Sequence, residues 1–161
     1  MNALLIVLLA PLAGAVVLAL FRPLRWAGWL NVGVSAVSFA AAMMLAWTVA
    51  TVGEVAGFTF RIDAFNVYLV ALNTFVGLTT SIFSRPYMRH VCETGKIGNR
   101  GMRIYHSMYQ TFMFTMLLSL TTDNLGVLWV AVEGATLATV LLVSLYRTPE
   151  AVEAAWKYFI L

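Results

Sequence analysis

The sequence has 161 residues, of which 61% are hydrophobic and only 11% are charged, and its mean hydropathy is +0.87. This balance excludes an ordinary water-soluble domain and indicates a chain that lies mostly in lipid. The formal net charge is +3 at pH 7, but the basic residues fall between apolar runs rather than on one polar face, so we expect contact with a lipid bilayer surface and no binding of nucleic acid.

Five apolar stretches are long enough to cross a membrane, because a spanning helix needs about 20 mostly apolar residues at a rise of about 1.5 Å each. They cover residues 2–21, 27–51, 64–84, 104–122 and 125–146. A sixth helix begins near Ala151. The sequence therefore predicts an all-α, multi-pass transmembrane helical bundle with five complete spans and the start of a sixth.

Lysine and arginine are divided unevenly among the loops between these stretches. The first, third and fifth loops hold nearly all of them, whereas the second and fourth hold only Arg61. Loops rich in Lys and Arg stay in the cytoplasm. We therefore predict that the N-terminus lies outside and that the basic loops lie in the cytoplasm.

The segment from Arg85 to Arg103 is the only long hydrophilic stretch, and its three glycines argue against a regular helix through it. We expect a solvated surface loop there. His90, Cys92 and Glu93 offer metal-ligand atoms, but no second cluster completes a four-ligand site. Nucleotide-binding motifs and nucleophile–base pairs are also missing from the sequence. We expect no metal, no cofactor and no active site of its own in this chain.

The last helix has a recognisable start. Thr148 is a capping residue, Pro149 suits the first helical position, and Glu150 lies near the positive end of the helix dipole. From Ala151 to Leu161 this helix crosses only about half of a bilayer. We therefore expect that residues 1–161 are the N-terminal part of a longer protein.

Glu133 lies in an otherwise uncharged run, eight residues or about 12 Å from Leu125 and thirteen residues or about 20 Å from Tyr146. An ionised carboxyl group near the middle of a spanning helix costs about 2.5–3.5 kcal/mol even on the lenient insertion scale, so the group is either neutral or partnered. A carboxyl that alternates between those states takes up and releases protons. The alternative is a carboxyl that only hydrogen-bonds between helices and never titrates.

Small residues surround Glu133 along the same helix, namely Gly126, Gly134, Ala135 and Ala138. Small side chains let another helix approach closely. This pattern favours a carboxyl group that faces protein rather than lipid, with its partner on another helix.

Two further residues are candidates for proton transfer. Lys157 comes early in the sixth helix, where it either snorkels to water at the inner surface or acts as a relay lysine that faces Glu133. His106 opens the fourth span at the cytoplasmic boundary, with Gln110 one turn later on the same face. It is either a proton entry point or an interfacial histidine beside water without a function.

Four segments carry a resemblance to a known family: RIDAF at 61–65, SRPYM at 84–88, LWVAVE at 128–133 and AWKYFIL at 155–161. Together they resemble the antiporter-like, proton-translocating subunits of respiratory complex I and membrane-bound hydrogenases. Within that family, residues 129–145 and the YRTP segment at 146–149 are most similar to the F-type branch of the hydrogenase-4 subunits. The resemblance covers essentially all of this chain and about the first third of a family member.

The resemblance implies that Glu133 corresponds to a glutamate that pairs with a lysine on a broken seventh helix, which lies beyond this sequence. Lys157 matches the family lysine early in the sixth helix. Many relatives have Trp directly before the glutamate, where this chain has Val132. The resemblance also implies that proton movement is coupled to electron transfer in a peripheral arm with iron–sulfur clusters, and that this subunit holds no redox centre.

The expected function is therefore that of a membrane subunit that moves protons across the inner (plasma) membrane of a bacterium or archaeon. Electron transfer in a hydrogenase-4 or NADH:quinone oxidoreductase-like complex would drive it, and the partners would be other membrane subunits of that complex. Two alternatives stay open. One is a truncated structural subunit that conducts nothing, and the other is a subunit of a multi-subunit cation/proton antiporter.

Overall fold

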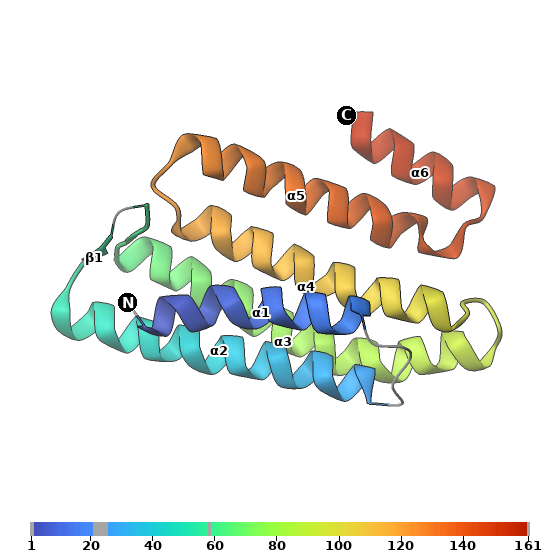
Figure 1. Cartoon of the computed structure of the whole chain (residues 1–161), viewed down its shortest axis with the longest axis horizontal. Coiled ribbons are helices and arrows are strands. Elements are labelled where there is room, and N and C mark those ends of the chain that lie inside the picture. Colours follow the sequence, from blue (N-terminus) through green and yellow to red (C-terminus); the bar gives the residue numbers. More distant parts are fainter. Residues whose placement is uncertain (1, 21–25, 58, 161) are drawn as a thin grey trace.

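The computed structural model describes residues 2–20, 26–57 and 59–160 and is almost entirely helical (Figure 1). Its helices are α1 (Asn2–Leu20), α2 (Ala27–Val52), α3 (Ala64–Glu93), α4 (Asn99–Thr121), α5 (Leu125–Val143) and α6 (Pro149–Ile160). A 3-10 turn, η1 (Ser144–Tyr146), follows α5, and a short hairpin of β1 (Val55–Ala56) and β2 (Arg61–Ile62) joins α2 to α3. The predicted all-α fold is confirmed. Arg22 and Arg25 of the first basic loop, and Leu161, lie outside the described residues.

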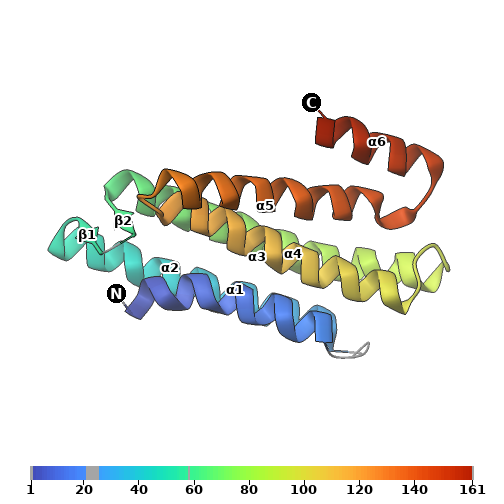
Figure 2. The ribbon, with the colours of Figure 1, turned by 45° about the horizontal axis from the view of Figure 1, so that its top comes forward.

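Helices α1 to α4 form a four-helix bundle. α1 packs against α2 and α4, and α3 packs against the same two helices, so the four enclose one common core. α5 packs along the outside of α4, and α6 folds back against α5 (Figures 1 and 2). The chain therefore consists of a closed bundle with two helices added to one side.

Among the described helices, four are long and apolar enough to cross a membrane: α1, α2, α3 and the Leu125–Tyr146 segment. The predicted count of five complete spans is not confirmed, because α4 falls outside this group. α4 carries several polar side chains that face other helices, including the buried Ser107 and Gln110. A helix enclosed by protein needs less apolar surface than one that faces lipid on most sides.

The surface loop predicted over Arg85 to Arg103 was wrong. α3 continues through Pro86 to Glu93 and α4 begins at Asn99, so the connection covers only residues 94–98. The reason is a small apolar cluster of Met88, Val91 and Ile97, which packs against Tyr105 and Leu145. Met88 and Val91 are three residues apart, so one helical face can bury both, and this packing extends the helix despite the nearby charges.

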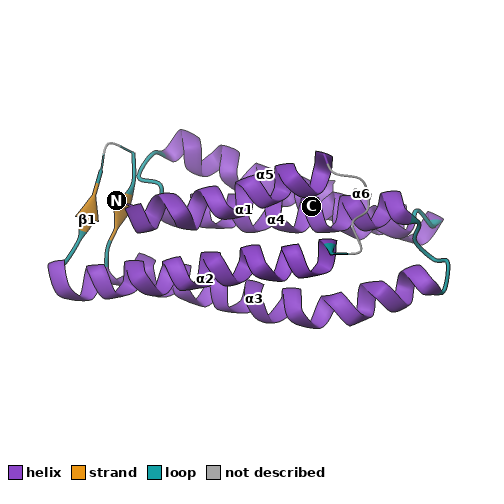
Figure 3. Ribbon diagram, turned by 60° about the horizontal axis from the view of Figure 1, so that its bottom comes forward, coloured by secondary structure: helices purple, strands orange, loops and turns teal. Residues whose placement is uncertain are grey.

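The hairpin forms a cap over one end of the bundle (Figure 3). Its two strands pair antiparallel, with Val55 opposite Ile62, and the side chain of Ile62 is fully buried in the core. The connection also holds the α4–α5 turn, because the backbone N–H of Asp123 donates to the carbonyl of Thr59 at 2.9 Å. We call this the hairpin end, and the opposite end, where residues 94–98 connect α3 to α4, the basic-loop end.

The core of the bundle is divided along its length. At the hairpin end it is apolar, with a continuous cluster that includes Leu4, Leu8, Leu45, Val70 and Leu117. Towards the basic-loop end, buried polar side chains replace the apolar ones; they are Asn31, Ser35, Ser38, Ser81, His106, Ser107 and Gln110. Thr121, at the hairpin end of α4, is also buried, so among the described residues it is the buried amide and imidazole side chains, and not all polar ones, that lie towards the basic-loop end.

Candidate functional site

The position of Glu133 follows from the start of α5. Asn124 caps this helix, because its Oδ1 accepts hydrogen bonds from the backbone N–H groups of Gly126 at 2.9 Å and Val127 at 3.2 Å. The helix then runs without a break to Val143. Glu133 therefore lies in the middle of α5, as the sequence indicated.

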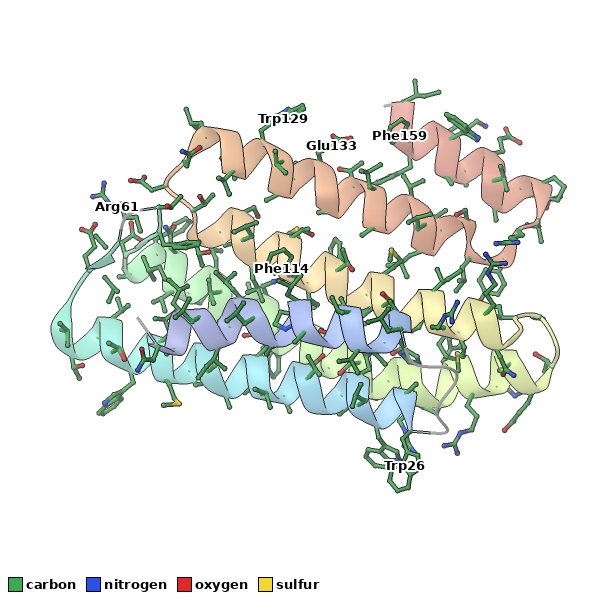
Figure 4. All side chains as sticks on the ribbon, in the orientation of Figure 1. Trp26, Arg61, Phe114, Trp129, Glu133 and Phe159 are labelled. Carbon is green, nitrogen blue, oxygen red and sulfur yellow. The ribbon has the colours of Figure 1, made fainter. Side chains whose placement is uncertain are left out.

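The small residues of α5 lie on the side of the helix that faces α4, whereas the carboxyl group of Glu133 does not. Ala131, Ala135 and Ala138 are buried in this interface, and a Cβ built on Gly134 would come within 2.9 Å of the Thr115 side chain of α4. Figure 4 shows Glu133 on the other side of α5, pointing away from α4. The small residues do allow close helix approach, but they do not turn Glu133 towards the bundle.

Glu133 stands half-buried on a face that is otherwise apolar and largely uncovered. Trp129 and Val130, one turn earlier, are 70% and 61% exposed, and Leu137, one turn later, is also exposed. Within the described residues, Glu133 has no ion pair and accepts no side-chain hydrogen bond. Its carboxyl group is thus a polar group on an apolar surface, near the middle of a helical segment long and apolar enough to cross a membrane.

Lys157 forms an ion pair with Glu153 on α6. The Nζ of Lys157 lies 2.6 Å from Oε1 of Glu153, one helical turn earlier, and both side chains are mostly exposed. The structure therefore places Lys157 beside a carboxylate of its own helix. The predicted start of this helix is confirmed, because the Thr148 hydroxyl accepts a hydrogen bond from the backbone N–H of Ala151 at 3.2 Å.

His106 does not lie at a water-exposed helix start. α4 begins at Asn99, so His106 lies two turns inside the helix, and its side chain is only 2% exposed. The edge of its ring meets the ring of Tyr105, with centroids 5.2 Å apart. The prediction of an interfacial histidine beside water was therefore wrong, because α4 extends one turn and more towards the basic-loop end than its apolar residues indicated.

The described residues do not bring the three predicted proton-transfer residues together. Glu133 lies on the outer side of α5, Lys157 pairs within α6, and His106 is buried in the α1–α4 bundle. No hydrogen bond or ion pair in the described part of the chain joins any two of them. Each is a separate candidate.

A buried amide pair was missed by the sequence analysis. The Nε2 of Gln110 on α4 donates to Oδ1 of Asn31 at 2.8 Å, to the Asn31 carbonyl at 3.2 Å and to the Ser35 hydroxyl at 3.1 Å, both on α2. The signal was present in the sequence as Asn31, Ser35 and Ser38 at helical spacing in an apolar run. The sequence did not indicate that these residues face Gln110 on α4.

The segments that carried the family resemblance also have structural roles. Within 84–88, the Arg85 guanidinium lies 3.7 Å above the Trp29 ring of α2. The Tyr87 and Tyr146 hydroxyls lie 3.0 Å apart and join α3 to η1, the turn that follows α5. These contacts hold the helices together at the basic-loop end.

A cavity of about 280 Å³ lies at the basic-loop end, between the start of α4 and the segment where α5 ends and η1 begins. Lys96, Arg100 and Arg147 are among the residues that line it. Its lining contains none of Glu133, Lys157 and His106. The candidate proton-transfer residues therefore lie outside this cavity.

No family model matches the chain, but two curated proteins are similar to it. Over 155 residues the chain is 41% identical to the hydrogenase-4 component F homolog of Methylacidiphilum infernorum (isolate V4), an alignment that covers 96% of this chain and 32% of that protein. Over 181 residues it is 28% identical to NADH-quinone oxidoreductase subunit L of Escherichia coli (strain K12), covering 99% of this chain and 28% of that protein.

The long apolar helices and the carboxyl group in the middle of α5 define a multi-pass helical membrane protein. The two similarities confirm the resemblance drawn from the four sequence segments: the chain belongs to the family of antiporter-like subunits of hydrogenase-4 and complex I. It spans about a third of the length of the curated relatives that it matches.

Proposed function

We propose that the chain is part of a membrane subunit that moves protons across the inner membrane of a bacterium or archaeon. Electron transfer in a complex of the hydrogenase-4 or NADH-quinone oxidoreductase type drives this movement, and the redox centres lie in other subunits. α4 crosses the membrane with the four apolar helices, the N-terminus lies outside, and the basic loops lie in the cytoplasm. The family similarity and the loop charges support this proposal.

The observation that carries the proposal is the position of Glu133. Its carboxyl group lies on an uncovered apolar face in the middle of α5, and none of the described residues gives it an ionic partner. Since an ionised carboxyl facing lipid at this depth is unfavourable, further helices cover this face in the assembled protein. They supply a cationic partner, either from the remainder of a longer chain or from a neighbouring subunit.

A carboxyl group in that position can work as a proton carrier. When the cationic partner is close, the ionised form is favoured, and when the partner moves away, the apolar surroundings favour the protonated form. Alternation between the two states binds and releases one proton per cycle. Lys157 and His106 serve as additional transfer residues in this proposal, Lys157 near the inner surface and His106 within the bundle.

The test is Glu133→Gln in the complete complex. Glutamine keeps the shape and a hydrogen-bonding capacity but cannot ionise, so we expect redox-driven acidification of vesicles to be abolished while the subunits still assemble. Glu150→Gln is the matched control, because Glu150 is exposed in the first turn of α6, and it should retain proton movement.

The other two hypotheses give different results in the same experiment. A subunit that only packs against partner helices would leave proton movement unchanged in Glu133→Gln, and that result would contradict our proposal. A subunit of a cation/proton antiporter would lose proton movement driven by a cation gradient in the absence of an electron donor. Measurement with and without the electron donor separates these cases.

A further inference from the structure

The polar half of the bundle core contains a cluster that lies apart from Glu133. Asn31 and Ser35 come from α2, and His106 and Gln110 come from α4; all four are 0–2% exposed. Because α1 and α3 each pack against both α2 and α4, the last two helices lie diagonally opposite in the bundle, and this cluster reaches across its middle. His106 and Gln110 are four residues apart and share one face of α4, so their Cβ atoms lie about 5–6 Å apart.

Three buried polar atoms of this cluster have no hydrogen-bond partner among the described residues. Gln110 uses its Nε2 for all three of its contacts with Asn31 and Ser35. Asn31 Nδ2, Gln110 Oε1 and His106 Nδ1 have no hydrogen-bond partner among the described residues. A buried polar group without a hydrogen-bond partner destabilises the folded protein, so three such atoms in one cluster indicate a further occupant.

Three other buried polar residues of the same core, Thr74, Ser38 and Ser107, have hydrogen-bond partners. The hydroxyls of Thr74 and Ser38 donate to carbonyl groups of their own helices, at 2.9 Å to Val70 and 3.0 Å to Val34. The Ser107 hydroxyl donates to the Ala15 carbonyl of α1 at 3.0 Å. Apart from Asn73 Nδ2 on α3, the buried side-chain atoms without a partner among the described residues all belong to the amide pair and its neighbouring histidine.

The chemistry of the three atoms selects the occupant. Asn31 Nδ2 is a donor and Gln110 Oε1 is an acceptor, while His106 Nδ1 is either, depending on the tautomer. A water molecule both donates and accepts, and buried waters make about two to four hydrogen bonds to such groups. A metal cation fits less well, because the cluster holds no carboxylate and presents an N–H donor. An apolar ligand would satisfy none of the three atoms.

We propose that Asn31, Gln110 and His106 form a buried water-binding site in the polar half of the α1–α4 core. The apolar half of the core, with Leu45 and Leu117, separates this site from the hairpin end. The proposal does not depend on proton transport, because it rests on hydrogen bonds within the bundle alone.

Radiolytic footprinting of the complete complex tests the site without any mutation, because X-ray pulses generate hydroxyl radicals from bound water inside a protein. Met113 lies one turn from Gln110 and is 3% exposed, and Met88 lies in the apolar cluster at the basic-loop end and is 2% exposed. Bulk solvent reaches neither. We expect Met113 to be oxidised several-fold faster than Met88, and equal rates would overturn the proposal.

A pair of variants identifies the atoms that hold the water. Asn31→Leu combined with Gln110→Leu keeps similar volume and removes the amides, so oxidation of Met113 should fall to the rate of Met88. Thr74→Val is the control, because Thr74 is equally buried but satisfied by its own helix. Unchanged oxidation of Met113 in the paired leucine variant would also overturn the proposal. If that variant does not fold, the comparison in the unmodified protein decides.

Discussion

Asp63 fixes the point at which α3 begins. Its Oδ1 accepts hydrogen bonds from the backbone N–H groups of Phe65 at 2.9 Å and Asn66 at 2.8 Å, two donors that the first turn of a helix leaves unpaired. Directly before it, Ile62 is buried in the core and Arg61 pairs with Glu54 at 2.6 Å. This hydrogen-bonded pair also raises the pKa of the exposed Arg61 guanidinium. The 61–65 segment therefore joins the hairpin to the helix.

We predict that Asp63→Ala lowers the stability of the protein by about 0.5–2 kcal/mol, because the two N–H groups lose their acceptor. Asp63→Asn should retain most of the stability, since its amide oxygen accepts the same bonds. Thermal unfolding in detergent measures both variants. Equal losses for alanine and asparagine would show that the charge of Asp63, and not its capping bond, is what matters.

A substitution of Lys157 can distinguish a role in proton transfer from a contribution to the stability of the protein. The ion pair with Glu153 is exposed on both sides, and such pairs contribute only about 0–1 kcal/mol. We therefore predict that Lys157→Met leaves thermal stability nearly unchanged. If Lys157 is a relay residue, proton movement in the complete complex falls while stability stays. Normal proton movement in this variant would remove Lys157 from the proposed pathway.

At the scale of elements, the two faces of α5 differ in what they contact. The side with Ala131, Ala135 and Ala138 packs on α4, and the side with Trp129 and Glu133 is uncovered. The approach of α4 is close at Gly134, where the branched side chain of Thr115 fills the space that a Cβ would need. The absence of a side chain at Gly134 thus contributes to the close packing of α5 on α4.

We predict that Gly134→Ala weakens the α4–α5 interface by about 1–3 kcal/mol, because a β-branched side chain cannot turn aside as a flexible one does. Gly33→Ala is the matched control. Gly33 also lies inside a helix, but a Cβ there meets nothing within 4 Å, so the substitution should be neutral or stabilising. Thermal unfolding of the two variants checks this, and equal behaviour would contradict the close approach.

At the scale of the whole molecule, different interactions stabilise the two ends of the core. The apolar cluster at the hairpin end is held by close packing, and the polar half is held by hydrogen bonds between helices. In a bilayer, packing and interhelical hydrogen bonds are the main forces between helices, because lipid tails are as apolar as the side chains.

We predict that Leu45→Ala destabilises the protein by about 2–5 kcal/mol, because Leu45 is 1% exposed and its removal leaves a cavity that nothing fills. Leu72→Ala should have a much smaller effect, since Leu72 is 45% exposed and lipid or detergent tails fill the gap. Thermal unfolding in the same detergent compares the two. Similar losses would mean that the core is not packed as described.

The sequence by itself determined the class of the protein, the approximate helices and the place of Glu133 along its helix. Each of these depends on the order of residues along one helix, which apolar length and helical spacing report directly. The segments at 61–65, 84–88, 128–133 and 155–161 also identified the family, as the two relatives later confirmed.

Only the tertiary structure decided which residues meet. It turned Glu133 away from α4, buried His106, shortened the connection after α3 and joined Gln110 to Asn31, 79 residues earlier. Contacts of this kind arise from the packing of separate helices, and the spacing of residues along one helix holds no information about its partner. The polar half of the core was therefore visible only once α2 and α4 were placed in one bundle.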